Sequence, residues 1–213
     1  ERNNDMASWF AQYIGEPIER DGTLFAPEEL KYFNGILPDQ TPDRIFMPCD
    51  PAWGGGDFVA APCCYLYGND VYILDCVFDN NEKNITQPKI VNLIKKHKVQ
   101  AARFEATKMT ASYKEEIEKT LRESGYKINI TTKAAPTNKG KQQRIFDKAP
   151  EIRQFYFLEE GKRSKEYSLF MQNLYSFKVV GKNKNDDAPD SLAMAVEMLE
   201  NSGGYAEVFQ RPF

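Results

Sequence analysis

Short apolar runs separated by turn residues dominate the chain from residue 45 to residue 78. The runs at residues 45–49, 58–67 and 71–78 have the length of strands, and Gly68, Asn69 and Asp70 form a tight turn between the second and the third. This pattern predicts three strands in an antiparallel meander. The first strand ends at Asp50, beside a turn rich in proline and glycine.

Helical spacing of apolar residues replaces the strand pattern after residue 80. A helix is expected over residues 87–97 and a strand over residues 100–105. A strand reached through a helical crossover runs parallel to the strand it joins. We therefore expect Glu105 to end beside Asp50. The only histidine of the chain, His97, is expected on the surface of the crossover helix.

The remaining pattern alternates helices with short strands. The final helix opens with NDDAPDSLAMAVEMLE, in which Asp186 or Asp187 serves as the cap and Pro189 lies in the first turn. Before it, helices are expected over residues 111–124, 138–148 and 164–176, and strands over residues 126–131 and 155–158.

The order of these elements predicts an α/β domain with a mixed sheet, in which the antiparallel meander is joined by parallel strands and flanked by helices. Its expected bounds are residues 43–213. Residues 1–42 are expected to form a connecting arm, with an amphipathic segment at 6–14 and a short helix at 27–34. A chain of 213 residues is long enough for one sizeable core, and the tail from residue 202 is expected to be loose.

Composition excludes several classes of protein. The chain is 41% hydrophobic, but no apolar run has the length of a membrane span and the first residues do not form a signal peptide, so we expect a soluble intracellular protein. The four cysteines lack a CxxC pair and fall in or beside strands, which predicts reduced core residues. A single histidine argues against histidine-based zinc chemistry.

Charge is distributed unevenly along the chain. The net charge is −3, yet residues 1–60 hold 11 acidic against 4 basic residues and so carry −7, which leaves +4 for residues 61–213. The basic residues gather in two clusters, Lys139, Lys141, Arg144 and Lys148 in the first and Lys178, Lys182 and Lys184 in the second. Such clusters are found on solvated helix faces and on surfaces that contact polyanions.

Three acidic positions are expected to converge: Asp50, Glu105 and the cluster of Asp186, Asp187 and Asp190. A site of carboxylates without histidine suits Mg²⁺ or Mn²⁺, and two such ions can catalyse phosphodiester hydrolysis. Each position also has a purely structural explanation. Asp50 can cap its own turn, Glu105 can pair with a nearby cation, and the aspartates can cap the final helix.

Four segments together resemble a known family. CDPAWGGGDFVA, ARFEATKM, GKQQRIFDKAPEI and NDDAPDSLAMAVEM are similar, in order and spacing, to the C-terminal nuclease domain of the large terminase subunit of tailed bacteriophages. GEPIERDGTLFAPEEL resembles the linker that follows the packaging ATPase in that family. The resemblance implies a ribonuclease H-like fold and a two-metal-ion endonuclease that cuts double-stranded viral DNA concatemers during genome packaging.

The resemblance also assigns roles to the acids. It implies that Asp50 bridges both ions, that Glu105 binds one, and that Asp187 is the third ligand, with Asp186 and Asp190 as helpers. Asn185 stands where family members often place a histidine. The motif GxxxxGK[ST] is absent, so the ATPase domain is expected to be missing and ATP-driven translocation is not predicted.

The basic residues and the family resemblance also indicate the binding partners of the domain. Contacts to the DNA backbone, which carry little sequence information, are expected from basic residues that precede the acids, namely Lys139, Lys141, Arg144, Lys182 and Lys184. The resemblance implies the ATPase domain, the small subunit and the portal protein as partners, in the cytoplasm of the bacterial host. Two alternatives are an inactive ribonuclease H-like docking or scaffolding module and an actin-like or sugar-kinase ATPase, for which 213 residues are too few.

Overall fold

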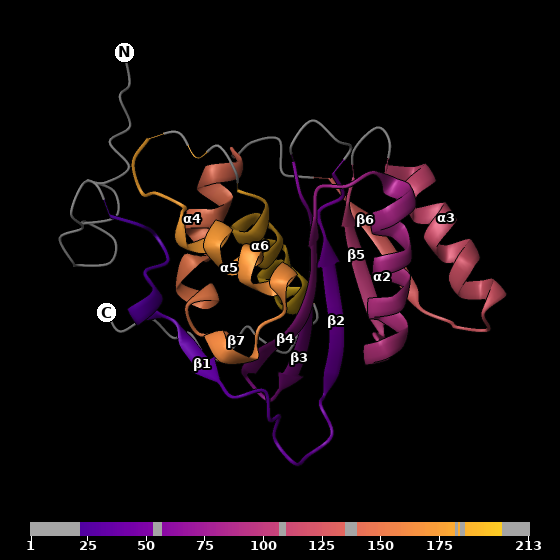
Figure 1. Cartoon of the computed structure of the whole chain (residues 1–213), viewed down its shortest axis with the longest axis horizontal. Coiled ribbons are helices and arrows are strands. Elements are labelled where there is room, and N and C mark those ends of the chain that lie inside the picture. Colours follow the sequence, from indigo (N-terminus) through magenta and orange to yellow (C-terminus); the bar gives the residue numbers. More distant parts are fainter. Residues whose placement is uncertain are drawn as a thin grey trace.

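The computed structural model describes residues 22–52, 57–106, 110–134, 140–181, 183 and 186–201. At its centre is a seven-stranded mixed sheet in the order β1-β7-β4-β3-β2-β5-β6, flanked by helices (Figure 1). The strands are β1 (Lys31–Phe33), β2 (Arg44–Cys49), β3 (Val59–Tyr67), β4 (Asp70–Asp79), β5 (Ala101–Glu105), β6 (Asn129–Lys133) and β7 (Tyr156–Leu158). The helices are α2 (Lys83–His97), α3 (Thr110–Glu123), α4 (Lys141–Ile152), α5 (Lys165–Tyr175) and α6 (Asp187–Glu200).

The antiparallel meander and the parallel crossover are both confirmed. β3 pairs antiparallel with β2 and with β4, and the strand after the crossover helix, β5, pairs parallel with β2. Phe46 of β2 lies opposite Ala101 of β5, and β6 continues the sheet in parallel beyond β5. Because β2 and β5 run in the same direction, their carboxyl ends meet at one edge of the sheet.

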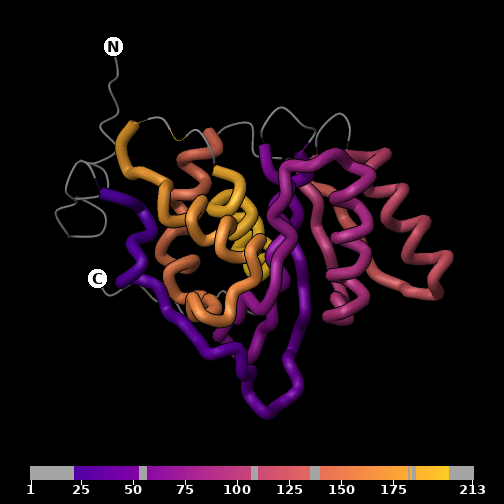
Figure 2. Tube along the Cα trace, in the orientation of Figure 1, coloured from indigo at the N-terminus to yellow at the C-terminus, as the bar shows by residue number. Residues whose placement is uncertain are grey.

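The sheet separates two hydrophobic cores. Alternate residues of β2 divide between them, with Phe46 facing α4, α5 and α6 and Met47 facing α2 and α3. The last helix, α6, is buried along almost its whole length and packs on β2 and β3, as the trace in Figure 2 shows. Among the described residues, no helix has both the length and the apolarity that a membrane crossing requires.

The segment before the meander differs from its expected structure. The short helix expected at residues 27–34 is only one 3₁₀ turn at Pro27–Glu29, and β1 follows it at once. β1 pairs parallel with β7, more than a hundred residues later in the chain, so no local pattern announces it. Leu24 and Phe25 are fully buried in the core. The domain boundary at residue 42 stays a prediction, and the segment expected at residues 6–14 lies outside the described residues.

The expected surface position of His97 is wrong. The imidazole is buried, with Nδ1 3.0 Å from the Tyr65 hydroxyl and Nε2 2.9 Å from the Asp75 carboxylate. α2 ends at His97 and is capped by Lys98 in the left-handed conformation; His97 is buried against β3 and β4, whereas Lys95 and Lys96 are exposed. The expectation for the cysteines is confirmed, because all four are free and buried.

The other expected elements exist with shifted ends. α2 begins at Lys83, four residues before its expected start, and α4 extends to Ile152 and contains Pro150. The expected tail from residue 202 lies outside the described part of the chain. These shifts do not change the fold class. The mixed sheet flanked by helices confirms the α/β class expected from the sequence.

Candidate metal centre

Two acids stand at the carboxyl ends of neighbouring parallel strands. Asp50 directly follows β2, and its backbone exchanges two hydrogen bonds with Ala60 of β3, at 3.0 and 3.1 Å, which fixes its position at the sheet edge. Glu105 is the last residue of β5. The convergence expected from the parallel crossover is therefore observed.

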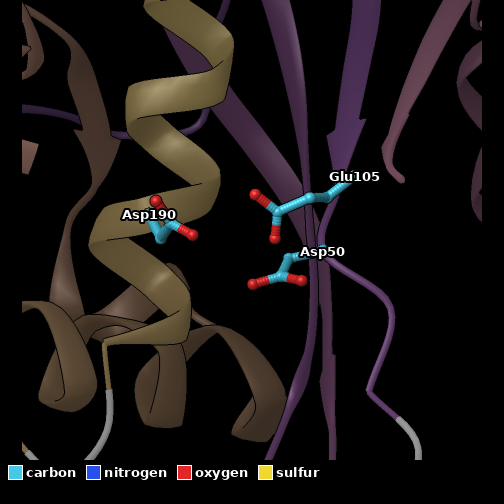
Figure 3. Close-up of side chains that lie close together, drawn as sticks. All are labelled: Asp50, Glu105 and Asp190. Atoms are coloured by element: carbon cyan, nitrogen blue, oxygen red, sulfur yellow. The ribbon is translucent and has the colours of Figure 1, made fainter. Parts of the chain in front are cut away.

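The third acid of this group comes from the first turn of α6. Asp190 is completely buried, and its side chain points from the helix toward the two strand ends (Figure 3). Asp50, Glu105 and Asp190 each place one carboxylate oxygen within 4.8 Å of the others. Acids that are far apart in the sequence thus form one cluster, which we call the acidic triad.

The two aspartates that precede Asp190 lie at the margin of the triad. Asp187 accepts a hydrogen bond of 3.3 Å from the backbone N–H of Phe58, the residue just before β3. Asp186 occupies the N-cap position of α6, but its side chain makes no capping hydrogen bond. The close group therefore contains Asp190, while the ligand roles of Asp186 and Asp187 stay predictions.

Two cations of α4 lie among these acids. The Lys141 ammonium is 3.1 Å from oxygens of Asp186 and Asp190 and 3.3 Å from Asp50. The Arg144 guanidinium donates to Glu105 at 2.8 Å and, through Nε, to Asp190 at 2.9 Å. Lys141 and Arg144 are one helical turn apart and so share a face of α4.

For the basic cluster the sequence suggested a solvated helix face or contacts to a polyanion, and the inward direction of both cations was not expected; the alternative that Glu105 pairs with a nearby cation agrees with its contact to Arg144. The helical spacing of Lys141 and Arg144, three residues apart like Asp187 and Asp190, was the available signal that two charged faces could meet. Arg144 is only 6% exposed, whereas the Lys141 side chain is 37% exposed. Lys139, Lys182 and Lys184 lie outside the described residues.

Burial sets the protonation of the acids. The pKa of Asp50 is raised to about 8, chiefly by burial and also by Glu105, Asp190 and Asp187, although Lys141 opposes the rise. Burial likewise raises the pKa of Asp190, and Lys141 and Arg144 oppose it. The two nearby cations therefore do not offset the cost of burying these acids in their charged form.

For the two cations, burial and the neighbouring charges have opposite effects on the pKa. Burial alone would lower the pKa of Lys141 and of Arg144, but the surrounding carboxylates more than reverse this and hold both values above the ordinary ones. Both side chains therefore keep their positive charge. Five carboxyl groups then share two cations, which leaves an excess of three acids.

The triad suits a divalent cation. Its donors are carboxylate oxygens, the ligands that hard ions such as Mg²⁺ and Mn²⁺ prefer. One oxygen of Asp190, Oδ2, is buried and has no hydrogen-bond partner among the described residues, although the Lys141 ammonium lies 3.1 Å from it. The ion pair with Lys141 offsets part of the cost of burying this oxygen, and a metal ion would supply the directional contact that it lacks. The residues present thus fit a metal ion.

The sheet topology and the acids at its edge define the class of the domain, a ribonuclease H-like fold. The family model described as "Terminase Bacteriophage T7, Ribonuclease H-like domain" matches residues 49–154, which include Asp50, Glu105, Lys141 and Arg144. Residues 49–154 therefore belong to the terminase ribonuclease H-like family.

Solved structures agree on the fold. The large terminase of a thermophilic bacteriophage superposes with a TM-score of 0.57 at 15% identity, over 90% of this chain and 50% of that one. The human cytomegalovirus terminase nuclease domain, Mn soaked and inhibitor bound, gives 0.53 at 11% identity, over 81% and 90% of the two chains.

The nuclease domain of the large terminase subunit gp2 of bacterial virus Sf6 gives a TM-score of 0.50 at 13% identity, over 73% of this chain and 88% of that one. A search of curated proteins returned no match. The chain spans about half the length of the thermophilic phage's large terminase, and the likeness to these structures concerns the fold.

Proposed function

We propose that this domain is a metal-dependent endonuclease that cuts double-stranded viral DNA concatemers during phage genome packaging. The observation that carries the proposal is the acidic triad, in which a buried oxygen of Asp190 has no hydrogen bond. Membership of the terminase family supplies the substrate class, and the charge excess supplies the need for metal.

Asp50, Glu105 and Asp190 would hold Mg²⁺ or Mn²⁺, with Asp187 and Asp186 as further donors to a second ion. When bound, two such ions supply an activated water and neutralise charge on the phosphodiester. Two sets of contacts position the ligands. Backbone hydrogen bonds with Ala60 fix Asp50, and Arg144 bridges Glu105 to Asp190. Arg144 thereby sets the distance between a strand-borne and a helix-borne ligand.

Lys141 has a different role in this proposal. Its ammonium lies among Asp50, Asp186 and Asp190, where it partly compensates their charge. Because its side chain is 37% exposed, it can exchange a carboxylate for a DNA phosphate, whereas the buried Arg144 acts through the acids it holds. Lys139, Lys182 and Lys184 complete the proposed set of backbone contacts.

The setting of this activity is part of the proposal. The family membership favours an ATPase domain of the same subunit, the small subunit and the portal protein as partners, in the cytoplasm of the bacterial host. The alternative is an inactive docking module in which Lys141 replaces the metal permanently. Its position among three carboxylates is the observation in favour of that alternative.

Direct binding of Mn²⁺ separates the two. Isothermal titration of the chain with Mn²⁺ should show binding that Asp50→Asn and Glu105→Gln remove, and the same variants should lose metal-dependent nicking of supercoiled plasmid. Absence of both binding and nicking would favour the docking module, whereas binding without nicking would retain the metal centre and argue against the endonuclease activity. Absence of Mn²⁺ binding would overturn the proposed metal centre.

A further inference from the structure

The start of α6 carries three acids of the candidate metal centre, Asp186, Asp187 and Asp190. The first N–H groups of a helix have no partner within that helix, and the side chain of the N-cap residue usually accepts from the second or the third of them. An N-cap aspartate that does so is turned toward the backbone of its own helix. The metal centre therefore depends on how the start of α6 is capped.

Asp186 occupies the N-cap position of α6 without capping it. Its side chain makes no capping hydrogen bond, and one of its carboxylate oxygens lies 3.1 Å from the Lys141 ammonium. The third helical residue is Pro189, which has no N–H. The second helical residue, Ala188, thus offers the only N–H that an N-cap side chain normally bonds.

A neighbouring helix supplies the partner of this N–H. The backbone N–H of Ala188 donates to Oδ1 of Asn173, near the C-terminal end of α5, at 3.0 Å. Ala188 is fully buried and Asn173 is only 8% exposed, so the bond is shielded from water. Asn173 thus caps α6 from outside the helix, while the Asp186 carboxylate stays beside Lys141.

Asn173 is the polar exception on the buried face of α5. The other buried residues of this helix are aromatic or apolar, namely Tyr167, Phe170, Met171 and Leu174. A buried amide costs free energy unless its polar atoms are hydrogen-bonded. The bond to Ala188 satisfies the amide oxygen and fixes the start of α6 against α5, which packs beside it (Figure 1).

The position of this first turn decides where its acids lie. The N–H of Asp190 donates to the carbonyl of Asp186 at 2.9 Å, so the backbone connects the N-cap directly to the acid of the triad. A first turn without its cap would fray, and both acids would lose their fixed position. The bond from Ala188 to Asn173 opposes this fraying without using a carboxylate.

We propose that Asn173 is a positioning residue of the metal centre, which caps α6 from α5 and so leaves the acids of the first turn available to the ion. Asn173 does not touch the ion in this proposal, and it acts through Asp186 and Asp190. The inference rests on the proposed nuclease function for the presence of the ion, but the cap itself is tested without metal.

The test compares two substitutions of nearly equal size at this position. Asn173→Leu removes the acceptor, whereas Asn173→Asp keeps an oxygen at the same place. In calorimetric titration of the full chain, Asn173→Leu should weaken Mn²⁺ binding about tenfold, the lower end of the loss expected when a contact that orients a metal ligand is removed. Asn173→Asp should bind within about threefold of the unsubstituted chain. Asn173→Ala replaces the leucine variant if that variant does not fold.

Ser191→Ala is the matched control. The Ser191 hydroxyl donates to the carbonyl of Ala188 at 2.8 Å, so its loss removes another buried hydrogen bond from the start of α6 and leaves the cap in place. The Mn²⁺ affinity of this variant should equal that of the unsubstituted chain. Thermal melting of each variant in EDTA verifies that the chain is folded.

Amide hydrogen exchange at Ala188, followed by NMR in EDTA, reports on the cap directly. Asn173→Leu should accelerate this exchange about tenfold, and Asn173→Asp should leave it slow. Unchanged exchange in Asn173→Leu would overturn the cap. Unchanged Mn²⁺ affinity in Asn173→Leu, or an equal loss in Ser191→Ala, would overturn the role of Asn173 toward the metal.

Failure of the proposed function gives a different result. If the unsubstituted chain bound no Mn²⁺, the proposed metal centre would fall together with the role of Asn173 toward it. Accelerated exchange at Ala188 in Asn173→Leu would still establish Asn173 as the cap of α6. A chain that binds Mn²⁺ with equal affinity before and after Asn173→Leu retains the metal centre and loses only the inference.

Discussion

Two clusters of acidic and basic side chains lie at the same edge of the sheet, and they differ in how far the charge of the acids is compensated by neighbouring donors. The first is the acidic triad with Lys141 and Arg144. The second, which we call the β4 cluster, consists of Asp79 at the end of β4, Lys89 of α2 and Glu166 of α5. Because β2 and β4 are both antiparallel to β3, their carboxyl ends reach the same edge.

The β4 cluster satisfies its acids internally. Asp79 accepts from Lys89 and from the backbone and side chain of Asn81, and Glu166 accepts from Lys89 at 2.5 Å and from the Phe78 backbone at 3.2 Å. Burial raises the pKa of Asp79, but these hydrogen bonds outweigh it and the pKa is lowered overall. Lys89 thus connects α2 and α5 through the acids.

The comparison teaches how to separate a structural ion pair from a candidate metal site when both contain buried acids. In the β4 cluster the surrounding donors lower the pKa of the acid, whereas in the triad burial raises the pKa of Asp50 to about 8. Proximity of acids alone does not distinguish the two. The distinguishing property is charge that the protein leaves uncompensated.

The largest expected difference is between Asp50→Asn and Asp79→Asn. Asp50→Asn should reduce Mn²⁺-dependent plasmid nicking on the order of a thousandfold, because a metal ligand is lost. Its melting temperature should stay the same or rise, since repulsion within the triad falls. Asp79→Asn should lower the free energy of unfolding by about 2 kcal/mol, which corresponds to a fall of roughly 4 to 8 °C in melting temperature, and should leave nicking intact.

Nicking assays and thermal melting of the two purified variants measure both quantities. Glu105→Ala should behave as Asp50→Asn does. A large loss of stability in Asp50→Asn, with a small loss in Asp79→Asn, would reverse the comparison and assign the triad to structure.

The pH dependence of stability gives the next effect. The folded pKa of Asp50, about 8, exceeds its ordinary value of 3.8, so between these values the folded metal-free protein binds a proton that the unfolded chain has released. Stability should therefore fall as pH rises from about 4 to about 8, on the order of a few kcal/mol. The raised pKa values of Asp187 and Asp190 act in the same direction.

Denaturant titrations at pH 5 and pH 8 in EDTA measure this loss. Asp79 and Asp75 have lowered pKa values, so their stabilisation is lost only as pH falls below about 4, outside this window. Asp50→Asn should flatten the dependence, and Mn²⁺ at pH 8 should restore stability. Equal stability at both pH values in the unsubstituted chain would contradict the excess charge of the triad.

The sequence predicted the parts of the triad that follow from topology. A strand, a helical crossover and a parallel strand require Asp50 and Glu105 to end at the same edge, and they do. The family resemblance implied Asp187 as the third ligand, but the residues alone could not decide between Asp187 and Asp190, because both lie in the first turn of α6 and only the packing of that helix decides which one points inward. Asp190 is the one in the close group.

The pairing of distant strands and the hydrogen-bond partners of buried polar side chains could not be predicted from the sequence, because both depend on residues far away in the chain. β1 has three residues and is defined by its partner β7, so its own pattern resembled a short helix. His97 looked polar and terminal, yet Tyr65 and Asp75 from two strands supply the partners that allow its burial. Lys141 and Arg144 were identified as basic residues near the acids, but their inward direction depends on how α4 packs beside α6.

Substitution of one lysine in each cluster, Lys141 in the triad and Lys89 in the β4 cluster, tests the comparison further. Lys141→Met should strengthen Mn²⁺ binding on the order of tenfold, because it removes a positive charge about 3 Å from the triad oxygens. Lys89→Met should leave Mn²⁺ binding unchanged and lower the melting temperature, since Asp79 and Glu166 lose their shared donor. Calorimetric titration with Mn²⁺ measures the first effect. Unchanged Mn²⁺ affinity in Lys141→Met would show that Lys141 does not compete with the metal.

The smallest expected effect distinguishes the two helix-borne acids. Asp190→Asn removes a carboxylate from the close group and should weaken Mn²⁺ binding strongly, whereas Asp187→Asn should change it only about threefold, because that carboxylate accepts from the Phe58 backbone. Titration of both variants compares them under identical conditions. A larger loss in Asp187→Asn would make Asp187 the third ligand, as the family resemblance implies, and would mean that metal binding draws the start of α6 toward the strand ends.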